Sequence, residues 1–211
     1  MTKESRKKIR VLLADDHMVV RMGIASLLSF ANGIEVIGEA DNGLDAVKIA
    51  HELKPDVVLM DLQMPELNGV EATARIHADD PGAKILILTS FGTSAELKRA
   101  MDAGAAGALV KSSSRTEIID AIRGVMAGKV VMSDEIRHTI ENISAMPEMS
   151  PRQTEILNLV AKGFSNKEIA EIIGISPETV KEHVAKILHS IGASSRAEAA
   201  TIAVNLGLIT G

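Results

Sequence analysis

The chain has 211 residues, of which 46% are hydrophobic, and it carries a formal net charge of −5 at pH 7. This length fits one large domain or two small ones, and the hydrophobic content excludes a disordered chain. The absence of cysteine excludes disulfides and thiolate metal sites. With three phenylalanines and no other large aromatic residue, the chain has little with which to stack the bases of a single-stranded nucleic acid.

The first ten residues, MTKESRKKIR, are basic like the start of a signal peptide, but the apolar run after them spans only Val11 to Ala14. Such a run is too short for export, and no stretch approaches the length needed to span a membrane. We therefore expect a cytoplasmic protein that has no membrane segment.

Short β-rich runs alternate with helix-periodic segments over the first part of the chain. The expected strands are Ile9–Ala14, Glu35–Ala40, Asp56–Met60, Lys84–Leu88 and Ala108–Val110. The expected helices lie at about 18–30, 43–53, 69–78, 93–103 and 115–127. Repeated strand and helix predict right-handed crossovers and a doubly wound parallel α/β sheet that is covered on both faces.

Polar residues follow four of these strands directly: Asp15 and Asp16, Asp61, Thr89, and Lys111. Because ligands of an open α/β sheet bind beyond the carboxyl ends of its strands, these side chains should meet at one rim. Gathered carboxylates repel one another, and Mg²⁺, which prefers oxygen ligands, would offset that repulsion. A lysine and a hydroxyl beside them suit a phosphoryl group.

Each of these residues also has an ordinary structural interpretation. Asp15 and Asp16 could cap the first helix, Asp61 could cap a turn, and Lys111 could be a solvated surface residue. What favours the functional interpretation is the order in which an acidic pair, an acid, a hydroxyl and a lysine occupy successive strand ends.

Residues 149–211 are predicted to form four short helices, because residues typical of helix starts and helix ends recur along this segment. Helix starts are indicated by four serines, two of them in the capping boxes Ser165-Asn166-Lys167-Glu168 and Ser195-Arg196-Ala197-Glu198, and the others at Ser150-Pro151 and Ser176-Pro177. Helix ends are indicated by Gly163, Gly174 and Gly192. Residues 128–148 are expected to be a linker with a short helix after Ser133 and a final stretch that contains Pro147.

The second and third of these helices, 166–173 and 177–190, are separated only by Gly174-Ile175-Ser176, which is the spacing of a helix-turn-helix. An apolar stripe on the later helix must face the core and consists of Val180, Val184, Ile187, Leu188 and Ile191. The exposed side carries two lysines and two glutamates, so its charge gives only modest support for DNA binding. A helical hairpin that only packs or dimerises is the alternative.

Residues 9–127 resemble the receiver domain of two-component response regulators, a flavodoxin-like fold with a five-stranded sheet in the order 2-1-3-4-5. The resemblance implies that a histidine kinase phosphorylates Asp61, and that the ligands of Mg²⁺ are Asp15, Asp16, Asp61 and the backbone carbonyl of Gln63. It also implies that Thr89 is the switch hydroxyl and Lys111 the phosphate-binding lysine. In-line attack by Asp61 on the phosphoryl donor would give an aspartyl phosphate.

Two positions depart from the receiver pattern. Ala108 stands where receivers usually carry an aromatic residue that swings inward after phosphorylation, and Ser112 stands where a proline is common. Neither change removes a residue that phosphorylation needs. The usual transmission of the signal, by movement of an aromatic side chain at this position, is lost.

The stretch SPRQTEILNLVAKGFSNKEIAEIIGISPETVKEHVAKI resembles the LuxR-type helix-turn-helix, so that the whole chain resembles a NarL/FixJ-class response regulator. The resemblance implies that Asn166 and Lys167 contact phosphates of double-stranded DNA. It also implies that five residues of the later helix lie at the DNA groove: Thr179, Lys181, Glu182, Ala185 and Lys186. Glu182 could accept a hydrogen bond from cytosine N4 or merely repel phosphate. The last helix, 195–206, is the candidate for pairing two copies as a homodimer.

The leading hypothesis is a transcription factor whose DNA binding is controlled by Mg²⁺-dependent phosphorylation of Asp61, and which is not an enzyme. One alternative is a Mg²⁺-dependent phosphohydrolase with Asp61 as nucleophile. Such enzymes need a second acid two residues later, where this chain has Gln63, and a substrate-capping insertion. A further alternative, which Ala108 favours, is a regulator that binds DNA whether or not it is phosphorylated.

Overall fold

The computed structural model of the chain describes residues 8–90, 94–144, 149–205 and 208–209. Four features that the sequence singles out lie outside these residues: the basic start of the chain (1–7), Thr93 at the start of an expected helix, Pro147 in the expected linker, and Leu206 at the expected end of the last helix. The chain forms two compact units, and the main division between them falls between Arg137 and His138. Within the described parts of the chain, no helix is long and apolar enough to cross a lipid bilayer.

The first unit is built on a parallel sheet with the strand order β2-β1-β3-β4-β5-β6. The strands are β1 (Ile9–Ala14), β2 (Ile34–Ala40), β3 (Val57–Met60), β4 (Lys84–Thr89), β5 (Gly107–Val110) and β6 (Val131–Met132). The expected order 2-1-3-4-5 is confirmed, but the expectation of five strands is wrong by one. The sixth strand has two residues, which pair with Gly107 and Ala108 at the sheet edge. A strand this short has too few residues to show a period of two, so its sequence resembles a linker.

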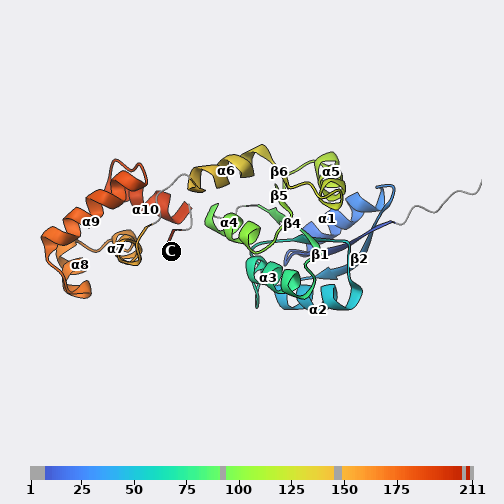
Figure 1. Cartoon of the computed structure of the whole chain (residues 1–211), viewed down its shortest axis with the longest axis horizontal. Helices are drawn as coiled ribbons and strands as arrows, with labels where there is room; N and C mark the ends of the chain where they lie inside the picture. Colours follow the sequence, from blue (N-terminus) through green and yellow to red (C-terminus); the bar gives the residue numbers. More distant parts are fainter. Residues whose placement is uncertain (1–7, 91–93, 145–148, 206–207, 210–211) are drawn as a thin grey trace, which may run out of the picture. The chain divides into compact units, whose positions relative to one another are not determined.

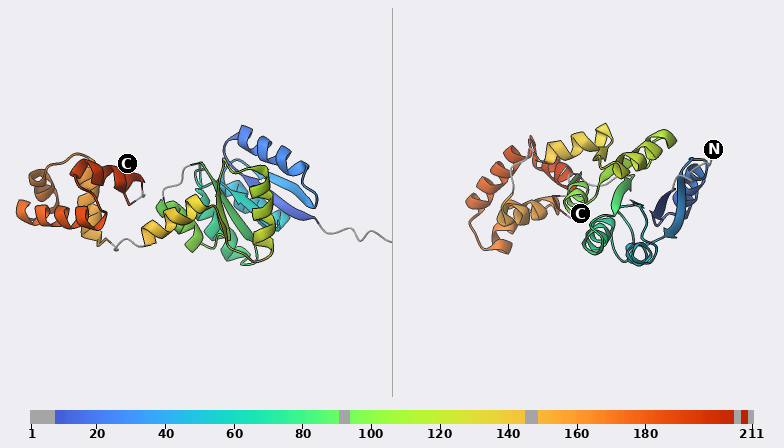
Figure 2. Two further views of the ribbon diagram at one scale, coloured as in Figure 1. Left: turned by 90° about the horizontal axis from the view of Figure 1, so that it is seen from above. Right: turned by 45° about the vertical axis from the view of Figure 1, so that its right-hand side comes forward.

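Helices cover both faces of this sheet. They are α1 (Met18–Ser29), α2 (Gly43–Leu53), α3 (Gly69–Asp79), α4 (Ser94–Asp102) and α5 (Arg115–Met126). Figure 1 shows α1 and α5 on one side of the sheet and α2 and α3 on the other, and the left view of Figure 2 shows α1 and α5 in front of the strands. This is the doubly wound arrangement that the alternating pattern predicts.

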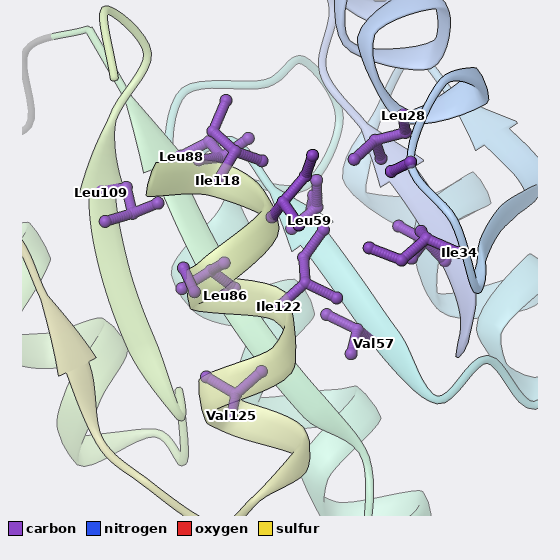
Figure 3. Packing of buried hydrophobic residues seen from close by; sticks show 14 of the residues in the cluster. Leu28, Ile34, Val57, Leu59, Leu86, Leu88, Leu109, Ile118, Ile122 and Val125 are labelled. Atoms are coloured by element: carbon purple, nitrogen blue, oxygen red, sulfur yellow. The ribbon is translucent and has the colours of Figure 1, made fainter. Parts of the chain in front are cut away.

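The core on the α1 and α5 side consists of aliphatic side chains from alternate strand positions. Figure 3 shows residues of the central strands, such as Leu59 and Leu86, directed toward Ile122 of α5. Leu12 and Met60 fall at the intervening positions and are also completely buried, because the sheet is covered on both faces. Burial on both faces explains why the sequences of the strands are continuous apolar runs rather than an alternation of apolar and polar residues.

The turn between β3 and α3 approaches the end of the strand closely. Asn68 caps α3 by accepting a hydrogen bond from the N–H of Glu71 at 2.9 Å. The N–H of Gly69 donates to the carbonyl of Leu62 at 2.8 Å. A Cβ atom on Gly69 would lie 1.9 Å from the carbonyl oxygen of Asp61, so only glycine fits there. The sequence LNG therefore fixes the backbone around Asp61.

The second unit contains a small all-α domain. After α6 (Asp134–Ser144), its helices are α7 (Pro151–Ala161), α8 (Asn166–Ile173), α9 (Pro177–Ser190) and α10 (Arg196–Asn205), drawn from orange to red in Figure 1. They enclose a separate core in which Ile156, Leu157 and Ile169 are completely buried. The four expected helices of residues 149–211 are confirmed, and α8 and α9 have the expected bounds.

The helix caps of this domain follow the sequence with one exception. Ser150 and Ser165 form reciprocal capping boxes with Gln153 and Glu168. At α10 the hydroxyl of Ser195 accepts a hydrogen bond from the N–H of Glu198 at 3.2 Å, but the Glu198 carboxylate accepts from the N–H of Ser194 at 2.7 Å rather than from that of Ser195. The expected capping box at Ser195 is therefore only half formed, because the Glu198 carboxylate bonds Ser194 instead.

Candidate functional site

Two carboxylates lie side by side at the carboxyl edge of the sheet because β1 and β3 are paired in parallel. Ala14 is in register with Met60, so Asp15 and Asp61 follow at the same level. The N–H of Asp15 donates to the carbonyl of Ala40 at 3.1 Å, and the N–H of Asp61 donates to that of Ala14 at 2.8 Å. Asp15 is 3% exposed and Asp61 5% exposed. Strand register thus brings two buried acids together from positions far apart in the sequence.

Lys111 lies between these two acids. Its Nζ atom is 2.6 Å from Oδ2 of Asp15 and 2.8 Å from Oδ2 of Asp61. The backbone is held by a hydrogen bond of 2.8 Å from the N–H of Lys111 to the carbonyl of Thr89, at the end of β4. The lysine side chain is only 11% exposed, which rules out the interpretation of Lys111 as a solvated surface residue.

Burial, hydrogen bonds and neighbouring charges shift two pKa values in this cluster. Burial raises the pKa of Asp61 above its ordinary value, and the nearby Asp15 charge adds to the rise, while the hydrogen bond and charge of Lys111 oppose it. Burial by itself lowers the pKa of Lys111, but hydrogen bonds to Asp15 and Asp61 and their charges outweigh this effect and raise it. Lys111 is therefore positively charged, and the carboxylates around it remain incompletely neutralised.

Asp15 and Asp16 do not cap α1 with their side chains in the usual way. The N-cap of α1 is His17, whose side chain forms no capping hydrogen bond. Oδ1 of Asp15 instead accepts a hydrogen bond from the N–H of His17 at 2.9 Å, and Oδ1 of Asp16 lies 2.6 Å from Nδ1 of the same histidine. His17 is not among the residues that the sequence pattern predicts for the site. Its place directly after the acidic pair was the available signal.

A small cavity of about 80 Å³ opens at this edge of the sheet, and the residues that line it are His17, Asp61, Gln63, Thr89, Ser90 and Lys111. Thr89 is 3% exposed. Possible metal-binding atoms of Asp15, Asp16, His17 and Asp61 all lie within 4.8 Å of one another. The structure thus brings all six residues that sequence analysis assigned to this site into one place, together with His17.

Ala108, the departure from the receiver pattern, is completely buried in β5. It pairs with Ile87 of β4 on one side and with Met132 of β6 on the other. Its methyl group lies inside the sheet layers, so nothing at this position corresponds to an aromatic side chain that could move between solvent and core.

In the second unit, α8 and α9 form a helix-turn-helix. Gly174 ends α8 in the left-handed conformation with φ of 71°, and Ser176 caps α9 by accepting from the N–H of Thr179 at 3.1 Å. The predicted apolar stripe of α9 faces the core: Val180, Ile187 and Ile191 are buried, and Val184 and Leu188 are partly buried. The opposite side of α9 is solvent-exposed, with Lys181, Glu182, Ala185 and Lys186.

The start of α8 carries the two residues expected to contact phosphates. Lys167 is exposed, whereas Asn166 is half-buried. Oδ1 of Asn166 accepts a hydrogen bond of 2.8 Å from Nη1 of Arg196, the first residue of α10. Arg196 cannot be predicted from the sequence as a partner of Asn166, because the contact joins positions that are remote in the chain and follows no local pattern.

Comparison with known proteins assigns a family to each unit. The sequence model of the family described as "Response regulator receiver domain" matches residues 11–123. That of the family described as "Bacterial regulatory proteins, luxR family" matches residues 147–203. The two matches together cover most of the chain.

Relatives are similar over nearly the full length. The response regulator protein VraR of Staphylococcus aureus is 44% identical over 206 residues, which cover 95% of this chain and 99% of VraR. The crystal structure of ChrA, the response regulator of a heme-sensing two-component system, has 34% identity and a TM-score of 0.58, and the match covers 96% of this chain and 99% of ChrA. RcsB of Salmonella enterica serovar Typhimurium, in a structure bound to the promoter P1flhDC with a phosphomimetic, has 25% identity and a TM-score of 0.76 over 95% of this chain and 100% of RcsB.

Fold, family matches and relatives agree on one assignment. The receiver match spans the sheet on which the acidic cluster lies, and the luxR match spans the helix-turn-helix. The chain therefore belongs to the two-component response regulators of the NarL/FixJ class, transcription regulators that join a receiver domain to a LuxR-type DNA-binding domain.

Proposed function

We propose that a partner histidine kinase phosphorylates Asp61 in a Mg²⁺-dependent reaction, and that this phosphorylation controls binding of the LuxR-type domain to double-stranded DNA. The observation that carries the proposal is the position of Lys111, whose ammonium lies within 2.8 Å of both Asp15 and Asp61 beside a small cavity. A buried ammonium next to a carboxylate with open space in front of it suits a group that must hold a phosphoryl oxygen.

The residues present fit a magnesium ion. Asp15, Asp16 and Asp61 supply carboxylate oxygens that lie within 4.8 Å of one another, and the backbone carbonyl of Gln63 is the further ligand that we assign. Hard oxygen donors of this kind are the ligands that Mg²⁺ prefers, and the cluster carries more negative charge than Lys111 neutralises. When bound, the ion would offset the negative charge of the carboxylates and of the incoming phosphoryl group.

In the proposed reaction, a carboxylate oxygen of Asp61 forms a bond to phosphorus as the bond between phosphorus and the imidazole nitrogen of a phosphohistidine breaks. The electron pair of the broken bond stays on the imidazole, and the product is an aspartyl phosphate. Lys111 moves from the Asp61 carboxylate to a phosphoryl oxygen, and the hydroxyl of Thr89 donates to another. Both side chains line the same cavity as Asp61, which supports these roles.

In the DNA-binding domain, we assign phosphate contacts to Asn166 and Lys167 at the start of α8. The groove contacts are assigned to Thr179, Lys181, Glu182, Ala185 and Lys186 of α9. Exposure of the last four side chains supports this assignment. The hydroxyl of Thr179 is engaged with Ser176 at 3.0 Å, so this residue would reach DNA through its methyl group or after releasing that bond.

Phosphorylation would act by shifting the population of two receiver states, one of which favours pairing of two chains. The assigned bounds are 9–127 for the receiver domain, 128–148 for the linker with a short helix, and 149–211 for the DNA-binding domain. A homodimer that reads two half-sites in the cytoplasm is the form that we expect on DNA. The second candidate function, DNA binding independent of phosphorylation, is favoured by one observation: Ala108 is a buried methyl group that cannot act as an aromatic switch.

One experiment separates the candidates. The full chain is incubated with acetyl phosphate and Mg²⁺, and phosphoprotein, released phosphate and affinity for DNA are measured. The proposal requires a stable phosphoprotein that is lost in Asp61→Asn, is kept in the control Asp120→Asn, and binds DNA more tightly than the unphosphorylated chain. Steady release of phosphate indicates a phosphohydrolase instead. Unchanged DNA affinity after phosphorylation supports the independent regulator.

A further inference from the structure

Asn166 and Arg196 connect the starts of two helices in the DNA-binding domain. Asn166 is the first residue of α8, directly after the capping serine Ser165, and Arg196 is the first residue of α10. Nη1 of Arg196 donates to Oδ1 of Asn166 at 2.8 Å, and Nη2 of Arg196 donates to the carbonyl of Phe164. One guanidinium group thus bonds both the backbone just before α8 and the first side chain of that helix.

This contact determines how the carboxamide of Asn166 is oriented. A guanidinium group has only donors, so the atom of the amide that faces Arg196 must be the oxygen. The NH₂ group of Asn166 must then point to the other side, where it remains available as a donor. Asn166 is half-buried rather than buried, so a ligand can reach it.

The position of Arg196 is unfavourable for its own helix. The start of a helix carries a partial positive charge, which disfavours a cation there. Arg196 lies at the start of α10 and also contacts the start of α8, so it meets this cost at two helix ends. Its contacts across the domain, rather than a contribution to α10, account for an arginine at this position.

We propose that Arg196 is a positioning residue for DNA binding: it holds the oxygen of the Asn166 carboxamide inward, so that the NH₂ group faces outward to donate to a DNA phosphate. This inference rests on the proposed function, in which Asn166 contacts a phosphate. It adds a residue that does not itself touch DNA. Without the fixed oxygen the amide would rotate freely, and its donor would face the phosphate for only part of the time.

The competing interpretation is that Arg196 only joins α10 to the turn before α8. Arg152 provides a matched control for it, because Nη2 of Arg152 similarly donates to a backbone carbonyl of the same domain, that of Ile173, at 2.6 Å, while Nη1 contacts Glu155. Substitution of either arginine by lysine keeps the charge and removes the planar fork that serves two acceptors at once. Only Arg196→Lys should affect Asn166.

The test is a double-mutant cycle with the full chain. The dissociation constant for a fluorescent duplex of random sequence is measured by anisotropy at several salt concentrations. Asn166→Ala should weaken binding about tenfold, the effect expected for one hydrogen bond to a charged phosphate. The slope of log affinity against log salt should not change, because the lost donor is uncharged. Arg196→Lys should weaken binding by a smaller factor in the wild-type background, about twofold, because a freely rotating amide faces the phosphate about half of the time, and it should have no effect in the Asn166→Ala background.

Several outcomes would overturn the inference. If Arg196→Lys weakens binding equally in both backgrounds, Arg196 acts through the folding of the domain, as Arg152→Lys is expected to do where it has any effect. A second variant, Asn166→Asp, guards against misfolding. It keeps an acceptor for Arg196, so its melting temperature should equal that of the wild type. It loses the donor and adds a negative charge, so DNA binding should fall more than tenfold. Wild-type affinity in Asn166→Asp would refute the proposed role.

Failure of this inference can be distinguished from failure of the proposed function by the adjacent residue. Lys167→Ala removes a cation from the same helix start and should lower the salt slope by about one if α8 lies on a phosphate. If that slope is unchanged, the proposed contact of α8 with DNA is wrong. If it falls by about one while the cycle between Asn166 and Arg196 is additive, only the positioning role of Arg196 is wrong.

Discussion

Nζ of Lys111 lies 2.8 Å from Oδ2 of Asp61, although the two residues are 50 positions apart in the chain. The same ammonium lies 2.6 Å from Asp15, so one lysine serves as counterion to two buried acids. A metal cation bound at these acids would take over part of that role. Lys111 would then be free to contact a phosphoryl group, which makes metal binding and the position of the lysine interdependent.

Replacement of Lys111 should therefore strengthen binding of Mg²⁺ to the unphosphorylated protein. In Lys111→Met the two carboxylates lose their counterion, and we expect roughly a fivefold gain in Mg²⁺ affinity, corresponding to an electrostatic effect of about 1 kcal/mol. Isothermal titration calorimetry measures this gain. Lys98→Met is the control, since Lys98 pairs with Asp102 on the exposed side of α4. Weaker Mg²⁺ binding in Lys111→Met than in the wild type would contradict the role of Lys111 as a competing cation.

The raised pKa of Asp61 predicts that this residue reduces the stability of the metal-free protein. Because the folded state binds the Asp61 proton more tightly than the unfolded chain, the free energy of unfolding falls as pH rises from the ordinary carboxyl pKa through the raised one. The loss is complete once the pH exceeds the raised pKa. Above that pH, Asp61→Asn should melt at a higher temperature than the wild type.

Thermal melts in the presence of a chelator at a series of pH values check this sign. The difference between Asp61→Asn and the wild type should shrink as pH falls through the raised pKa, where the wild-type carboxyl takes up its proton. Asp120→Asn, a change at a carboxylate whose side chain is 66% exposed, should leave the melting temperature within the small range of surface substitutions. A melting temperature of Asp61→Asn below that of the wild type at neutral pH would show that the carboxylate is net stabilising.

Gly69 is expected to be as important for phosphorylation as the residues that line the cavity. A Cβ atom there would lie 1.9 Å from the carbonyl oxygen of Asp61, and because backbone atoms cannot yield as a flexible side chain does, Gly69→Ala must displace Asp61 or α3. We expect the rate of phosphorylation by acetyl phosphate to fall about tenfold or more, since misplacement by an ångström is costly in group transfer. Gly82→Ala is the control, because its nearest contact is the Asp80 side chain at 3.1 Å. Equal rates in the two variants would mean that the turn adapts without cost.

The acidic cluster could be predicted from the sequence because parallel strands deliver their carboxyl ends to one edge, so that Asp61 and Lys111 meet whatever the loops between them do. The helix-turn-helix could be predicted because Ser165 and Gly174 mark the bounds of α8 locally. Contacts that depend only on tertiary packing could not. The bond between Arg196 and Asn166 joins two helix starts with no shared period, and the pairing of β6 with β5 involves too few residues to leave a pattern.

Backbone conformation at the turn of the helix-turn-helix gives a prediction of stability. Gly174 has φ of +71° and open space where a Cβ atom would be, so Gly174→Ala costs only the strain of a left-handed residue, about 1 kcal/mol. Gly23 also has open space, but it lies within α1 without a positive φ, so Gly23→Ala should stabilise the receiver domain by about 0.5–1 kcal/mol. Chemical denaturation of the full chain, with the transitions of the two domains followed separately, measures both. Two changes of the same sign would show that φ does not decide the effect.

Lys181 should contribute to DNA binding through charge, in contrast to the neutral Asn166. Its side chain is exposed on α9 beside Glu182, and a contact between its ammonium and a phosphate releases a counterion from DNA. Lys181→Ala should therefore weaken binding to a random duplex and lower the slope of log affinity against log salt by about one. Lys129→Ala removes the same charge from an exposed position between α5 and β6 and should leave the slope unchanged. Because the two variants have the same net charge, a difference between their slopes measures local contact with DNA rather than the overall field of the protein. Equal slopes would mean that α9 approaches DNA with a face other than the one that carries Lys181.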